Sequence, residues 1–143
     1  MKQTSCLKAI LIFFVLHIST SSCNDVQESE VPDIPFSFNI NLVIDNELTI
    51  PGNSKFYNYG GFGGVIVVCE TPGTYYAYDA ACTYEINRNC KVVNSGISGE
   101  CKCCKAEYVL LYTAYPVKGP AVAPLRQYNV VEINNSTLRV YNN

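Results

Sequence analysis

The chain has 143 residues, the length of a single domain, and its 12 acidic and 10 basic residues give a formal net charge of −2. This acidic excess argues against nucleic acid as a partner. The only histidine, His17, lies in the apolar N-terminal stretch, so the sequence that follows has none. That composition excludes Ser-His-Asp and Cys-His catalysis, zinc sites of the His-Glu-x-x-His type and haem held by histidine. We therefore do not expect an enzyme of these classes.

Residues 1–22 have the features of an export signal. Lys2 and Lys8 provide a positive start, and residues 9–16 form an apolar run too short to span a bilayer comfortably. Small polar residues follow and lead to Cys23, an arrangement that resembles the lipobox of bacterial lipoproteins. The resemblance implies that Cys23 is lipidated and that the membrane is a partner through this anchor. It places the protein in the bacterial cell envelope, on the periplasmic face or the cell surface. The alternative is ordinary signal-peptide cleavage.

Residues 23–34 are polar and acidic and include Pro32, so we expect a flexible tether between the anchor and a domain over residues 35–143. Acidic residues just after a lipobox cysteine also resemble the surface-export signal of Bacteroidetes lipoproteins. Without Lys2 and Lys8, the mature chain has 8 basic and 12 acidic residues and a net charge of −4. The mature protein is thus expected to be one acidic domain on a tether.

The domain has the pattern of short strands. Residues 36–42 alternate between apolar and polar side chains, as in a half-buried strand. The β-branched run over 65–69 predicts a buried strand, and a Pro-Gly turn joins it to a second strand over 75–79 as a hairpin. No segment has a sustained helical period, so the fold class is all-β, a small antiparallel sandwich or barrel. Further strands are predicted over 107–113, 127–133 and 137–141, with a hairpin turn at 134–136.

Six cysteines lie in the domain, at positions 69, 82, 90, 101, 103 and 104. In an exported protein, an even number of cysteines first suggests disulfides. The densest group is Cys101-Lys102-Cys103-Cys104. The adjacent Cys103 and Cys104 are expected to have different partners, because a bond between neighbours is strained.

Two of the cysteine-bearing stretches resemble the ligand boxes of Rieske iron–sulfur domains. Cys82-Thr83-Tyr84 follows the predicted strand pair and resembles the Cys-x-His box. Cys101-Lys102-Cys103-Cys104 begins 19 residues after Cys82 and resembles the Cys-x-x-His box. The resemblance covers roughly residues 31–143 and implies a Rieske-like β domain with two cysteine-bearing loops, as in Rieske-like lipoproteins of Bacteroidetes. Residues 31–35 resemble the first residues of these lipoproteins. Residues 116–125 resemble the proline loop of the Rieske family, and residues 128–130 resemble the strand that follows this loop.

The same resemblance shows where the chain departs from the family. Cys82 and Cys101 occupy the positions of the two cysteine ligands, whereas Tyr84 and Cys104 occupy those of the two histidines. A Rieske cluster has two cysteines on one iron and two histidines on the other. A tyrosine phenol must lose a proton with a pKa of about 10 before it binds iron. The sequence therefore predicts degenerate ligand boxes and no standard [2Fe-2S] cluster.

We favour the hypothesis that the domain is cluster-free and disulfide-bonded. Two residues that would ligate one ion lie close together, so Cys82 and Cys101 are disulfide candidates. Many Rieske domains carry a disulfide between their two loops, and Cys90 and Cys103 are the candidates for that bridge. The two remaining cysteines would form a third pair or stay free. Each bridge is expected to stabilise the domain by roughly 3 kcal/mol.

Two other hypotheses stay open for the cysteines. In the first, Cys82, Cys101 and Cys104 bind a metal together with Cys90 or Tyr84, as zinc or as a variant iron–sulfur cluster. In the second, the thiols form a redox site. The leading expectation is a non-catalytic envelope lipoprotein with no cofactor, serving a binding or structural role toward an unidentified protein or small molecule. The alternative is an electron-transfer protein with a variant cysteine-ligated [2Fe-2S] or zinc site.

Overall fold

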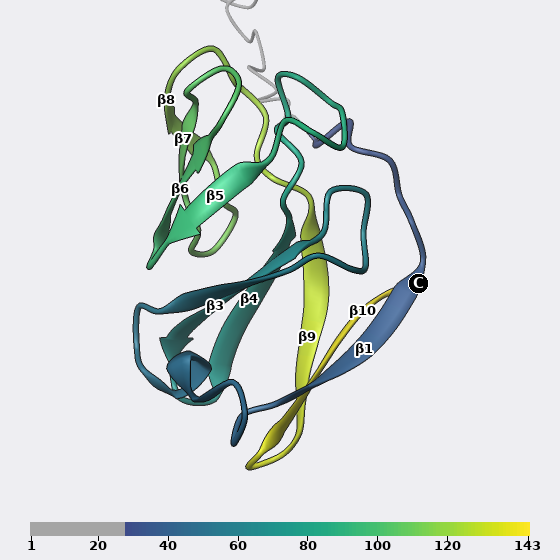
Figure 1. Ribbon diagram of the computed structural model, residues 1–143, viewed down its shortest axis with the longest axis vertical. Helices are drawn as coiled ribbons and strands as arrows, with labels where there is room; N and C mark the ends of the chain where they lie inside the picture. Colours follow the sequence, from purple (N-terminus) through teal and green to yellow (C-terminus); the bar gives the residue numbers. More distant parts are fainter. Residues whose placement is uncertain (1–27) are drawn as a thin grey trace, which may run out of the picture.

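The protein is described here by a computed structural model that covers residues 28–143 (Figure 1). The predicted signal peptide over 1–22, Cys23 and the first part of the predicted tether lie outside these residues. Within them the chain forms strands and one 3-10 helix, η1 (Asn46–Thr49). None of the described helical structure is long and apolar enough to cross a membrane. The strands are β1 (Phe36–Asn41), β2 (Ser54–Tyr57), β3 (Val65–Thr71), β4 (Thr74–Asp79), β5 (Val92–Ser95), β6 (Ser98–Cys101), β7 (Glu107–Val109), β8 (Pro116–Lys118), β9 (Gln127–Asn134) and β10 (Thr137–Asn142).

The strands form two sheets, and the pairings between them are antiparallel. The larger sheet has the order β1-β10-β9-β4-β3-β2, and the smaller sheet has the order β5-β6-β7-β8. Figure 1 shows the smaller sheet, in green, at one end of the larger sheet. This architecture confirms the predicted all-β antiparallel fold. The predicted cysteine-bearing loops are also present, at the end of the molecule that holds the smaller sheet.

The continuous apolar run of β3 is explained by two cores, one on each of its faces. Ile66 and Val68 lie in the core that the smaller sheet covers, together with Tyr78, Tyr108 and Leu110. Val65 and Val67 lie in the core beneath β1 and β10, together with Ile40, Leu138 and Val140. A strand buried on both faces has no polar side to present, so its sequence does not alternate. The run over 65–69 predicted this burial correctly.

The two predicted hairpins are confirmed. β3 pairs with β4 across the turn at Pro72 and Gly73, and β9 pairs with β10 across residues 135–136. The strand predicted over 107–113 ends at Val109 instead. Tyr112 and Ala114 have φ angles of +58° and +47°, a left-handed conformation that turns the chain and cannot continue a strand.

Four strands were not predicted, namely β2, β5, β6 and β8. Each has four residues or fewer, and β6 reads Ser-Gly-Glu-Cys, which is neither β-branched nor aromatic. Gly99 in β6 packs closely against Val92. A Cβ at position 99 would lie 2.5 Å from a Val92 methyl group, so a larger residue would force a shift there. These strands form because the tertiary contacts between them override weak local propensity.

The last part of the predicted tether contacts the domain. Val31 is fully buried, and the Arg126 side chain donates hydrogen bonds to the backbone carbonyls of Val31 at 2.7 Å and of Ser29 at 3.3 Å. Arg126 also lies 3.6 Å from the carboxylate of Asp33. Ordered packing therefore begins several residues before the predicted domain boundary at residue 35.

Candidate functional site: a three-thiol cluster between two loops

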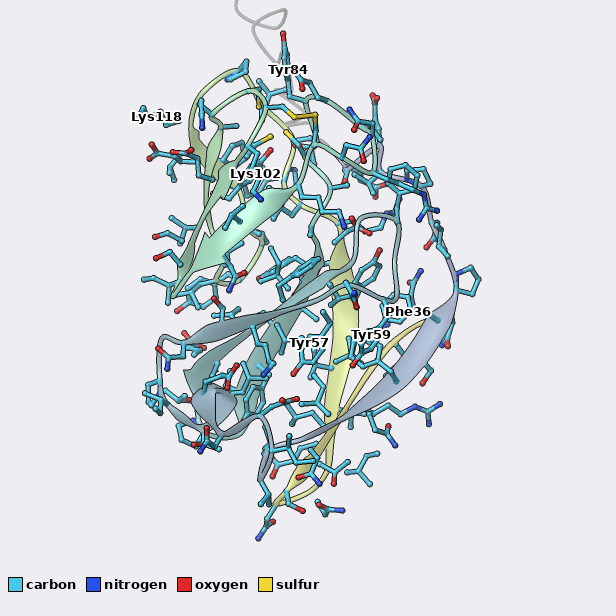
Figure 2. The ribbon with its side chains drawn as sticks, viewed as in Figure 1. Phe36, Tyr57, Tyr59, Tyr84, Lys102 and Lys118 are labelled. Atoms are coloured by element: carbon cyan, nitrogen blue, oxygen red, sulfur yellow. A yellow bond between two sulfur atoms is a disulfide. The ribbon has the colours of Figure 1, made fainter. Side chains whose placement is uncertain are left out.

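Two loops bring the cysteines together at one end of the molecule. The first loop, residues 80–91, leaves β4 and carries Cys82 and Cys90, while the second, residues 102–106, links β6 to β7 and carries Cys103 and Cys104. Cys101 is the last residue of β6. Figure 2 shows the yellow sulfur atoms gathered at this end. The second loop is tight, because its backbone closes on itself through hydrogen bonds from Cys101 N to Ala106 O at 2.8 Å and from Lys105 N to Cys101 O at 3.1 Å.

A buried carboxylate holds the start of the first loop. Asp79 is fully buried at the end of β4 and accepts four hydrogen bonds. Three come from the backbone N–H groups of Phe62 at 2.5 Å, Gly63 at 2.9 Å and Ala81 at 2.7 Å, and the fourth comes from the Tyr128 hydroxyl at 2.6 Å. Burial and this carboxylate together raise the pKa of Tyr128, so its hydroxyl stays a donor. The residue before Cys82 is thus fixed in place.

A disulfide joins the two loops. Cys90 and Cys103 are bonded, with their Cα atoms 5.5 Å apart. This confirms the predicted bridge between the loops. Cys103 is the loop cysteine nearest to solvent, whereas Cys90 is 7% exposed.

Three free thiols converge beside this bridge. The sulfur atoms of Cys82, Cys101 and Cys104 all lie within 4.8 Å of one another, and those of Cys82 and Cys104 are 3.4 Å apart. Cys82 and Cys101 are fully buried, while Cys104 is partly exposed. The predicted Cys82–Cys101 disulfide is not formed, since both residues are free thiols. The disulfide prediction considered a pair, whereas the structure brings together the three cysteines that the metal hypothesis named.

Tyr84 does not join the thiols, although the resemblance placed it at a ligand position. Its side chain is 57% exposed, and Figure 2 shows it projecting outward at the end of the molecule. The group of thiol and carboxyl ligands at this point contains Cys82, Cys101 and Cys104 alone among the described residues. Of the two fourth ligands considered for a metal set, Cys90 is bonded to Cys103 and Tyr84 is mostly exposed.

A hydroxyl network covers the buried side of the cluster. The Tyr108 hydroxyl lies 3.7 Å from the Cys82 sulfur and 3.0 Å from the Thr83 hydroxyl oxygen, and Thr83 donates to the Ala123 carbonyl at 2.8 Å. Tyr108 was not among the candidate site residues of the sequence analysis. The available signal was the resemblance itself, because Tyr108 stands where the second Rieske box has its aromatic residue.

The pKa values of Cys82 and Cys104 are shifted in opposite directions. Burial works against ionisation of Cys82, but hydrogen bonds from the Glu85 and Tyr84 backbone N–H groups and from the thiols of Cys101 and Cys104 outweigh it and lower the pKa of Cys82. Burial raises the pKa of Cys104 to about 12, and its proximity to Cys82 contributes to the increase. In the metal-free protein, Cys82 is therefore the first of the pair to become a thiolate.

Neither Cys69 nor the group of Glu85, Cys90 and Cys103 forms a second metal site in the described residues. Cys69 is a free thiol that is fully buried within β3, away from the three-thiol cluster. Burial raises its pKa, which makes it an inert residue of the core. Glu85 lies beside Cys90 and Cys103, but these two sulfurs are bonded to each other and have no thiolate to offer a metal.

The residues of the site do not fit the cluster that the family resemblance implies. A Rieske [2Fe-2S] cluster takes four ligands, two of them imidazoles. The site instead presents three thiols, and the chain has no histidine beyond His17. Tyr84, at the remaining ligand position, is turned to solvent. A standard Rieske cluster is therefore not compatible with this donor set.

Gly119 packs directly against Ala106 of the second loop, and this contact gives a first testable prediction. Gly119 has a φ of +93°, and a Cβ there would lie 2.6 Å from the Ala106 Cα. Replacing Gly119 with alanine is expected to lower the free energy of unfolding by about 2 kcal/mol, through strain at positive φ and displacement of Ala106. Urea denaturation measures this. Gly73→Ala is the control, since Gly73 has a φ of +90° but a Cβ there would meet only the Glu132 side chain, at an ordinary contact distance of 3.9 Å. Equal losses in the two variants would show that the contact with Ala106 is unimportant.

Comparison with known proteins shows a fold similarity and nothing finer. No protein-family model and no curated protein matches the chain. A chain in the complex of reduced oxygenase and oxidized ferredoxin of carbazole 1,9a-dioxygenase is 21% identical, with a TM-score of 0.51, covering 73% of this chain and 92% of its own. The ferredoxin of carbazole 1,9a-dioxygenase from Nocardioides aromaticivorans IC177 is 19% identical, with a TM-score of 0.50, covering 78% of this chain and 100% of its own. The described domain therefore has the fold of Rieske-type ferredoxins.

Proposed function

We propose that the protein is a lipid-anchored protein of the bacterial cell envelope whose Rieske-type domain lacks the standard [2Fe-2S] cluster and acts as a rigid binding or structural module. The observation that carries this proposal is the replacement of the ligand set. Three thiols, Cys82, Cys101 and Cys104, converge where the fold family places two cysteines and two histidines. Because function depends on the site and not on the fold, the electron transfer of the family does not carry over.

Three further observations support the proposal. The Cys90–Cys103 disulfide suits an oxidising compartment outside the cytoplasm, which is where a lipobox would send the chain. The disulfide and the buried Asp79 network fix both loops, so the end of the domain that would present a partner is rigid. A fold neighbour occurs in a complex of a ferredoxin with an oxygenase. By analogy, we expect a protein partner at this end of the domain.

The test is to purify the full-length protein in detergent and measure its iron, its acid-labile sulfide and its visible spectrum. The expected result is a colourless protein with no stoichiometric iron or sulfide. A brown protein with two irons and two sulfides per chain would overturn the cluster-free proposal and favour a variant electron-transfer site. The lipid anchor is tested separately by replacing Cys23 with serine, which should move the protein from the membrane fraction to the soluble fraction. Membrane retention of this variant would contradict the anchor.

A further inference from the structure

We propose that Cys82, Cys101 and Cys104 bind a single thiophilic cation with a filled d shell, Zn²⁺ or Cu⁺, in a site of three thiolates. The proposal rests on the cluster-free site proposed above and adds a ligand of defined chemistry to it. Soft thiolate ligands select such ions over Mg²⁺ or Ca²⁺, which take oxygen ligands. Two of the three sulfurs are fully buried, and the third is partly exposed.

The spacing of the sulfurs suits one ion. A zinc–sulfur bond of about 2.3 Å places two sulfurs of a tetrahedral site about 3.8 Å apart. The Cys82 and Cys104 sulfurs are 3.4 Å apart, and no pair in the cluster exceeds 4.8 Å. Sulfurs that ligate two different irons are separated further, because the distance between the metals adds to the distance between the ligands. The cluster is therefore of mononuclear size.

The backbone around the cluster holds the three ligands in place. Cys82 N donates a hydrogen bond to Cys90 O at 3.0 Å, Cys101 N donates to Ala106 O at 2.8 Å, and Lys105 N donates to Cys101 O at 3.1 Å. Lys105 has a φ of +62°, which lets the chain turn back directly after Cys104. The three sulfurs are thus brought together by the backbone of the two loops.

Charge balance also calls for a cation. Lys105 of the second loop is paired with Glu100 at 3.0 Å on the surface. Buried thiolates without a partner are costly, and a bound cation removes this cost by taking the place of the thiol protons. Such an ion would supply the positive charge that three thiolates need.

The site has room for a further ligand on one side only. Tyr108 closes the buried side, with its hydroxyl 3.7 Å from the Cys82 sulfur. The same hydroxyl lies 3.0 Å from the Thr83 hydroxyl oxygen, which holds it as a hydrogen-bond partner on this side of the site. Cys104 is partly exposed, which leaves the outer side open to a water molecule or to a group from a partner. Three protein ligands with one open position is the pattern of reactive or exchangeable zinc sites.

The experiment uses the full-length protein purified anaerobically in detergent. We would measure its zinc, copper and iron content, its affinity for added Zn²⁺ by chelator competition, and its absorption with Co²⁺ in place of zinc. The expected results are one Zn²⁺ or Cu⁺ per chain and the charge-transfer bands of a cobalt thiolate. Cys101→Ser and Cys104→Ser should each lower Zn²⁺ affinity about 100-fold or more, because loss of a residue that only supports a ligand already costs about 10–100-fold. Cys69→Ser is the matched control and should leave the affinity unchanged, since Cys69 lies outside the cluster.

The possible failures are distinguishable. A Cys82–Cys104 disulfide found by peptide mapping in metal-free protein, with no Zn²⁺ or Cu⁺ uptake, would overturn the metal proposal and leave the cluster-free function standing. Zn²⁺ affinity that is unaffected by Cys101→Ser and Cys104→Ser would also overturn it. Iron with stoichiometric sulfide at the site would overturn the cluster-free function itself. Circular dichroism of each variant establishes that a lost affinity does not reflect a lost fold.

Discussion

Replacing Asp79 with alanine is expected to lower the free energy of unfolding by about 4 kcal/mol, because it leaves buried donors without an acceptor. Asp79 is fully buried, and its carboxylate accepts hydrogen bonds from three backbone N–H groups and the Tyr128 hydroxyl. Each buried donor left unsatisfied costs about 1–3 kcal/mol. A domain of this size is stable by about 5–15 kcal/mol, so the loss is a large share of the total. Urea denaturation followed by circular dichroism measures it.

Two companion variants keep this prediction testable if Asp79→Ala does not fold. Tyr128→Phe removes only the 2.6 Å hydroxyl bond and should cost about 1.5–3 kcal/mol, because a hydrogen bond to a charged group is worth that much. Asp33→Ala is the surface control. Its carboxylate is 60% exposed and lies 3.6 Å from Arg126, so its loss should cost under about 1 kcal/mol. A loss for Asp79→Ala no larger than that for Asp33→Ala would contradict the assigned role of the buried carboxylate.

Removing the disulfide should have the next largest effect. The double variant Cys90→Ser, Cys103→Ser is expected to lose about 3 kcal/mol of unfolding free energy, because the bond closes a loop over a sequence separation of 13 and restricts the unfolded chain. The bond also joins the two loops that form the three-thiol cluster. We therefore expect both lower stability and greater access of alkylating reagents to Cys104, which is already partly exposed.

The measurement compares urea denaturation with and without a phosphine reductant. The native protein should lose about 3 kcal/mol on reduction, whereas the double variant should be insensitive to the reductant. Cys69→Ala, which removes a buried sulfur outside the site, controls for the loss of a core atom. A native protein that is as stable reduced as oxidised would contradict the stabilising role of this bond. A double variant that still responds to the reductant would reveal a second disulfide, with Cys82 and Cys104 the nearest free sulfurs.

The sequence by itself determined the fold class and the main strands. The apolar run of β3 and the Pro72-Gly73 turn predicted the central hairpin, because burial of a whole strand and the geometry of a tight turn are local properties. The short strands β2, β5, β6 and β8 were missed, since residues such as those of β6 have no strand pattern of their own. They pair with strands nearby in the chain, as β5 does with β6, but packing against the rest of the domain and not local propensity decides that they form.

The candidate site was also predictable from the sequence only in part. The two loops, the Cys90–Cys103 bond and the absence of imidazole ligands followed from the sequence and its resemblance to a family. Only the tertiary structure decided that the sulfurs of Cys82 and Cys104 are 3.4 Å apart, that Tyr84 faces solvent and that Tyr108 lies beside Cys82. The physical reason is that spacing along a chain specifies which residues share a loop. Distances between sulfurs depend on how two loops, held by Asp79 and the disulfide, turn toward each other.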